Sequence, residues 1–265
     1  MTQKTWNRNR SLFLFETLPV FKGTLLWLSL LSLVLIVLPV RFILLGEFSF
    51  NGQLIDQESR VNYVLAVGYS LIVFLATLFT ISLCLDRTGN QYLRNNDLLI
   101  LARDLGRPAF YFVKIASVIF PSTIYSILAL TLFWEELYRI AGVNLFQIYL
   151  LILPLSLSML CLTCLFFLMR IFLGNFLIFF IWMLLLPVIY FGNLWQYYGG
   201  ALRGITPKFP ILALLPQFGG IHAYSLGLVG DTFLRTDTWL ALVSGIVWTV
   251  LALLAGILSF RHQRF

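Results

Sequence analysis

Long apolar runs separated by short polar stretches dominate this chain. A helix that crosses the hydrocarbon core of a bilayer needs about 20 mostly apolar residues. Six runs meet this length: Gly23–Leu45, Val61–Leu85, Ile115–Phe133, Leu145–Met169, Ile171–Phe191 and Trp239–Phe260. Because backbone polar groups cannot remain unpaired in lipid, each run is predicted to be helical. The pattern therefore predicts an all-α polytopic membrane protein whose residues 1–265 form a single transmembrane domain.

The segment Ser11–Phe21 is apolar but too short to cross a bilayer, and basic residues flank it on both sides. Short segments of this kind lie in the headgroup layer of a membrane. We therefore expect residues 1–22 to form a cytoplasmic arm that contains an interfacial helix. Arg170 separates the fourth apolar run from the fifth, which predicts a tight helical hairpin with its turn at one membrane surface.

The longest connection, residues 192–238, has features of a membrane boundary. It opens with aromatic residues that favour this boundary: Trp195, Tyr197 and Tyr198. Further on, Pro210 and Pro216 enclose five apolar residues, which are too few to cross a bilayer. Irregular backbone at membrane depth is tolerated only inside protein or beside a water-filled cavity. We therefore expect a re-entrant segment before the last span, and we place His222 with it in a predicted outer gate.

The composition narrows the class of protein. Hydrophobic residues make up 60% of the chain and charged residues 11%, against about 25% charged residues in an ordinary soluble domain. So few charged side chains could not cover a globule in water, which excludes a soluble enzyme and a disordered tail. The cysteines at 84, 161 and 164 lie in or beside apolar runs, and we interpret them as small apolar side chains rather than as a disulfide framework or a redox motif.

The distribution of Lys and Arg predicts the orientation, because basic residues favour the cytoplasmic side of a membrane. With six spans, both ends of the chain and the even-numbered connections share one side. That side holds 12 of the 18 basic residues, so both termini are predicted to be cytoplasmic. The asymmetry also accounts for the net charge of +7 without a nucleic-acid partner.

The centres of the six runs contain no Asp, Glu, Lys, Arg or His. Ion-coupled carriers and proton pumps depend on ionisable groups inside the membrane, so this absence argues against both classes and against most intramembrane enzymes. The sequence also lacks the G-x-x-x-x-G-K-[ST] loop that binds nucleotide phosphates. We assign no catalytic residue, metal ligand or cofactor to the chain. Uphill transport would therefore take its energy from a separate subunit.

Residues 86–114 connect the second run to the third on the predicted cytoplasmic side. Asp97 precedes an apolar run and suits a helix N-cap, while Gly106 marks the end of that run. A helix of about nine residues between them is too short to cross a bilayer. It would present a leucine-rich ridge flanked by Arg103 and Asp104. Two interpretations remain open: an interfacial helix on lipid headgroups, or a coupling helix that docks into a groove of a soluble partner.

An acid, a glycine, a pair of apolar residues, an arginine and a lysine follow one another in this connection: Asp86, Gly89, Leu98 with Leu99 (or Ile100 with Leu101), Arg107 and Lys114. Together with six predicted spans and an interfacial N-terminal helix, this order resembles the permease subunit of ABC-2 type transporters. The resemblance implies an exporter in the inner (plasma) membrane. A separate ABC ATPase subunit would bind ATP and Mg²⁺, so the chain would not be an enzyme on its own. A second copy or a related permease would complete the path.

The resemblance assigns docking of the ATPase to one set of residues: Asp97, Leu98, Leu99, Leu101, Arg103, Asp104, Leu105, Arg107 and Lys114. Three alternatives remain open. The chain could be a structural or accessory subunit of a membrane complex, since its spans are poor in charge. It could be an intramembrane lipid-modifying enzyme that uses His222 with Asp231 or Asp237. It could also be a passive channel.

Overall fold

The computed structural model describes residues 3–23, 27, 30–31, 34, 41–42, 46, 49–50, 53–54, 56–87, 107–144, 147–186, 216, 218–222 and 239–262. This part of the chain is almost entirely helical. Its helices are α1 (Gln3–Lys22), α3 (Gln57–Arg87), α5 (Arg107–Ala141), α6 (Ile148–Phe172), α7 (Asn175–Leu186) and α11 (Trp239–His262). A short antiparallel hairpin of β1 (Ser49–Phe50) and β2 (Gln53–Leu54) precedes α3, with Ser49 opposite Leu54.

Four of these helices, α3, α5, α6 and α11, are long and apolar enough to cross a membrane. They coincide with the second, third, fourth and sixth predicted spans, which confirms that these segments are helices with the length and apolar character of membrane spans. Helix α7 covers 12 residues of the predicted fifth span, which is shorter than a bilayer requires. The first two residues of that span belong to α6, and residues 187–191 lie outside the described residues. The predicted first span is described only at Gly23, which forms a bend, and at six further positions, which are helical.

The helix ends differ in detail from the sequence prediction. Helix α5 continues past the apolar run to Ala141, because a stop signal comes only at Gly142. Gly142 has a φ of 67°, and its N–H donates to the carbonyl oxygen of Tyr138 at 3.0 Å. A left-handed glycine of this kind is a frequent helix terminator, since it has no Cβ to clash. At the other end of α5, Pro108 stands in the first turn, where its missing N–H costs no hydrogen bond.

The break between α6 and α7 lies at Leu173 and Gly174, three residues after the predicted position at Arg170. Arg170 is in the last turn of α6, and its Nη1 donates to the carbonyl oxygen of Leu173 at 2.9 Å. The guanidinium therefore caps the end of the helix, because it satisfies a carbonyl group that has no partner within the helix.

Helix α6 packs against α3, α5 and α11 and so occupies the middle of the bundle, by which we mean α3, α5, α6, α7 and α11. The largest buried side chains in the described ranges include Tyr69, Phe133, Trp134 and Phe166. Gly68 allows α3 to approach α5 closely, because a Cβ at this position would overlap the ring of Phe133.

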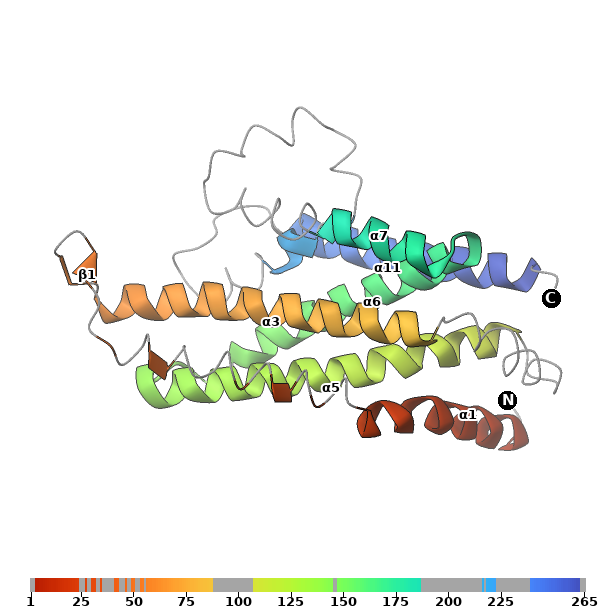
Figure 1. Ribbon diagram of the computed structural model, residues 1–265, viewed down its shortest axis with the longest axis horizontal. Helices are drawn as coiled ribbons and strands as arrows, with labels where there is room; N and C mark the ends of the chain where they lie inside the picture. Colours follow the sequence, from red (N-terminus) through yellow and green to blue (C-terminus); the bar gives the residue numbers. More distant parts are fainter. Residues whose placement is uncertain are drawn as a thin grey trace, which may run out of the picture.

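The described helices alternate in direction along the bundle (Figure 1). The end of α3, the start of α5, the α6–α7 connection and the end of α11 all lie at the end of the bundle where the C-terminus is marked, and α1 lies there too, outside α5. These are the segments that the sequence prediction assigned to one side of the membrane.

Candidate functional site

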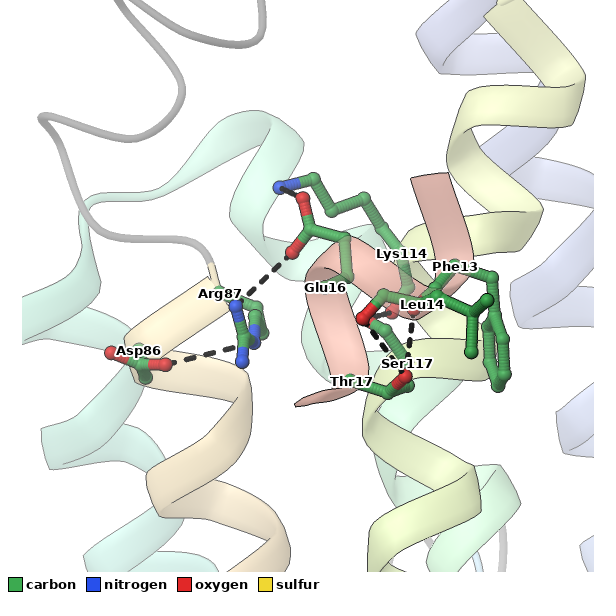
Figure 2. A network of polar contacts seen from close by, with 8 residues as sticks. All are labelled: Phe13, Leu14, Glu16, Thr17, Asp86, Arg87, Lys114 and Ser117. Atoms are coloured by element: carbon green, nitrogen blue, oxygen red, sulfur yellow. Dashed lines mark hydrogen bonds and ion pairs between the residues drawn. The ribbon is translucent and has the colours of Figure 1, made fainter. Parts of the chain in front are cut away.

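A buried cluster of charged side chains joins α1 to the bundle (Figure 2). Glu16 of α1 lies between two cations: its Oε2 is 3.2 Å from Nη1 of Arg87, and its Oε1 is 3.0 Å from Nζ of Lys114. Arg87 is the last residue of α3, and Lys114 lies two turns into α5. One carboxylate therefore connects α1 with α3 and α5, the two helices that flank residues 88–106 in the sequence.

The cluster holds two cations, Arg87 and Lys114, and two acids, the buried Glu16 and the exposed Asp86, so its charges balance. Glu16 and the two cations are buried, Glu16 fully so. The Nε of Arg87 lies 3.6 Å from the carboxylate of Asp86, which is exposed to solvent. The ammonium of Lys114 lies over the ring of Phe110, 5.4 Å from the ring centre, where the negative face of the ring attracts it. Because burying a charge costs several kcal/mol unless a partner compensates, each member depends on the others to stay buried.

Apolar contacts hold α1 in this position. Three residues of α1 spaced four apart face the bundle, since Leu12, Glu16 and Val20 are all buried. The rings of Phe13 and Phe21 pack edge-on against Phe120 of α5, with ring centres 5.6 and 6.4 Å apart. The helix thus crosses α5 at Phe120, which brings its single acid to the two cations.

The sequence prediction located only part of this cluster. Among the predicted docking residues, Arg107 is exposed at the start of α5, and Lys114 is buried against Glu16. The other predicted docking residues lie outside the described residues: Asp97, Leu98, Leu99, Leu101, Arg103, Asp104 and Leu105. Docking by any of these residues stays a prediction. A contact between a partner and Lys114 would have to involve Glu16 as well, since their side chains are paired.

Glu16 and Arg87 were missed as site residues, although a signal for Glu16 was present. Glu16 is the only acid in an apolar segment of 11 residues. An acid in such a segment calls for a cation nearby. The identity of that cation depends on packing between α1, α3 and α5, which a single sequence does not supply.

A second polar contact lies deeper in the bundle, away from the chain ends. Residues 218–222 form a short helical segment that is fully buried between α3 and α11. Within it, Nδ1 of His222 is 3.1 Å from the hydroxyl of Tyr69, and both side chains are buried. Ile221 fills the space beside Gly245 of α11, where a Cβ would come within 2.6 Å of its Cδ1.

The environment of His222 favours a structural role. Burial lowers the pKa of the imidazole to about 3, so the ring is neutral at pH 7. A neutral ring that shares a hydrogen bond with a tyrosine is suited to fix the segment in place. Of the other residues in the predicted outer gate, Pro216 is buried, while Trp195, Tyr197, Tyr198 and Pro210 lie outside the described residues.

Replacing Tyr69 with phenylalanine is expected to destabilise the protein by about 1–2 kcal/mol, because a buried hydrogen-bonding group of His222 loses its tyrosine partner. Denaturant-induced unfolding in detergent would measure the change. Tyr138, which is half exposed on α5, offers a matched control, and Tyr138→Phe is expected to have little effect. Equal effects of the two variants would show that the bond to His222 contributes nothing.

The three cysteines are buried, as expected for small apolar side chains. Within the described ranges, no three His, Cys, Asp or Glu side chains are placed to hold a metal ion. Comparison of the chain with protein-family models and with curated proteins gave no match.

Proposed function

We propose that this chain is the transmembrane permease subunit of an ABC transporter that exports a substrate using ATP hydrolysed by a separate subunit. In this proposal the chain lies in the inner (plasma) membrane with both termini in the cytoplasm. Two copies, or one copy and a related permease, enclose the path. Residues 88–106 contain the coupling helix that contacts the ATPase.

The observation that supports this proposal is the position of the Glu16 cluster. A soluble partner can move a membrane bundle only if the loop that it pushes is firmly attached to the helices on both sides. Arg87 and Lys114 stand on the two sides of that loop, and Glu16 pairs with both. Movement of the loop would therefore be passed to α1, α3 and α5 together rather than being lost in one flexible connection.

The composition of the membrane helices supports the proposal that a separate subunit supplies the energy for transport. The apolar stretches of α3, α5, α6 and α11 contain no ionisable Asp, Glu, Lys, Arg or His at their centres, so they offer no site for coupling to protons or sodium. The segment 218–222 fits the proposed re-entrant element at the outer side, because it is buried beside the middle of α3 and the first turns of α11. The neutral, hydrogen-bonded His222 gives no support to the lipid-modifying alternative.

The decisive experiment is a pull-down of the full chain from its own membrane in mild detergent, followed by an assay of ATP hydrolysis. The wild type is expected to bring down an ATPase. The double variant Leu98→Asp with Leu99→Asp is expected to lose it, because removing the apolar anchors of a docking helix costs about 2 kcal/mol or more. This corresponds to a loss of at least about tenfold in co-purified activity.

A matched control lies in the same loop. Asn95→Asp with Asn96→Asp adds the same charge and removes no apolar side chain, and it is expected to retain the ATPase. If the wild type brings down no ATPase, or if both double variants behave alike, the transporter proposal is wrong. An accessory subunit of a membrane complex would then be the better interpretation.

A further inference from the structure

Helix α1 distributes its side chains in the opposite way to a helix on the surface of a soluble protein. Its only acid, Glu16, faces the bundle. The opposite face exposes three large apolar side chains: Leu14 at 41%, Phe15 at 58% and Leu18 at 52%. An exposed apolar face of this size requires an apolar covering.

Exposed cations stand at both ends of this face. Arg10 precedes Leu14 by four residues and Lys22 follows Leu18 by four, and both basic residues are exposed. Because residues four apart lie one above the other on a helix, these four side chains form a single line. The line spans about 18 Å and carries no acid.

The contacts of Glu16 give the depth of the helix in the membrane. Arg87 closely follows the apolar run of α3, and Lys114 directly precedes the apolar run of α5. Both cations therefore mark the boundary between hydrocarbon and water, and Glu16 lies between them. The middle of α1 is at the level of the lipid headgroups, on the outside of the bundle (Figure 1).

The apolar covering continues from α5 onto α1. Phe120 of α5 is half exposed, and it is the residue on which α1 packs. If α5 crosses the membrane, lipid covers this ring, and the same lipid reaches the neighbouring face of α1. A groove on a soluble protein partner could not cover both helices, because it would have to end where α5 enters the hydrocarbon.

We propose that the face of α1 formed by Arg10, Leu14, Phe15, Leu18 and Lys22 is a binding surface for anionic lipid. The apolar side chains enter the upper acyl chains, and the two cations bind negatively charged headgroups. A basic residue near an anionic membrane strengthens association about fivefold, so the two together contribute about 30-fold. The lipid contact rests on the face itself; only its assignment to the inner leaflet rests on the proposed function.

This contact would also stabilise the charge cluster. The lipid-binding face and Glu16 are on opposite sides of the same short helix, so lipid that holds one face in place also holds the carboxylate against Arg87 and Lys114. The proportion of anionic lipid in the membrane would thereby determine how firmly Glu16 holds together α3 and α5, the two helices that flank residues 88–106.

Hydrogen exchange of the purified full chain in lipid nanodiscs tests the proposal. The amides of α1 are expected to exchange more slowly in phosphatidylcholine mixed with phosphatidylglycerol than in phosphatidylcholine alone, by up to about 30-fold. Arg10→Gln with Lys22→Gln is expected to remove the difference, and added salt to reduce it, because exposed charges are screened. Arg139→Gln, which removes an exposed cation from the far end of α5, is expected to preserve it.

Three results would overturn the proposal: equal exchange of α1 in the two lipids, a lipid difference that survives in the double glutamine variant, or slow exchange that depends on an added protein partner. Unchanged exchange in α6 shows that each variant is folded. The nanodiscs contain no ATPase, so absence of an ATPase in the pull-down would contradict the proposed function and leave this measurement unaffected.

Discussion

Replacing Glu16 with leucine is expected to lower the free energy of unfolding by about 3–5 kcal/mol, the usual cost of removing one partner from a buried ion pair. The reason is that Arg87 and Lys114, only 6% and 3% exposed, would lose the buried carboxylate that pairs with both, and Arg87 would keep only the solvent-exposed Asp86. Unfolding of the purified chain by SDS titration in mixed micelles, followed by tryptophan fluorescence, would measure the change.

Two further variants decide whether pairing is the cause. Glu135 and Arg139 form an ion pair on the exposed surface of α5, so Glu135→Leu is expected to cost less than about 1 kcal/mol. The triple variant Glu16→Leu, Arg87→Met, Lys114→Met replaces the whole cluster with apolar side chains and is expected to recover most of the stability. A triple variant as unstable as the single one would show that Glu16 acts through something other than its charge.

Gly68→Ala is expected to be the second most damaging change, at about 2–3 kcal/mol. The new Cβ would overlap the ring of Phe133, which is fully buried. Helices α3 and α5 would have to separate, and the contacts along their interface would be lost together. The same SDS titration measures this loss.

A compensating substitution at Phe133 tests whether its contact with residue 68 causes the loss of stability. The smaller side chain in Phe133→Leu vacates part of the space, so the double variant Gly68→Ala with Phe133→Leu is expected to be more stable than the sum of the two single changes predicts. Gly174 has open space around it, and Gly174→Ala is the matched control with an expected effect near zero. Strict additivity of Gly68→Ala and Phe133→Leu would mean that the two residues do not conflict.

The segments that cross the membrane were predictable because their signal is local. Apolar runs of at least 18 residues without charge predict spanning helices, and α3, α5, α6 and α11 follow those runs. The ends were harder to predict: α5 continues through Glu135 and Arg139, since a helix that leaves the hydrocarbon needs no apolar residues to persist. Its actual stop, the left-handed Gly142, is a local signal that the hydropathy pattern does not contain.

The candidate site was predictable only in fragments because its contacts join distant parts of the chain. Lys114 and His222 could be named from the sequence, but Tyr69 stands 153 residues before His222, and Glu16 stands 71 residues before Arg87. No spacing rule connects such pairs. They follow from the way α1, α3 and the segment 218–222 pack, and that packing depends on many side chains at once.

The sequence distance between Glu16 and its partners has a consequence for biosynthesis. The chain is made from its N-terminal end, so Glu16 leaves the ribosome 71 residues before Arg87. Its interval before Lys114 is longer still. During that interval the acid stays in water or at the membrane surface, because nothing in the nascent chain yet neutralises it inside the bundle. Helix α1 can therefore take its final place only after α5 has been inserted, so a segment that is synthesised before α3 and α5 is fixed after them.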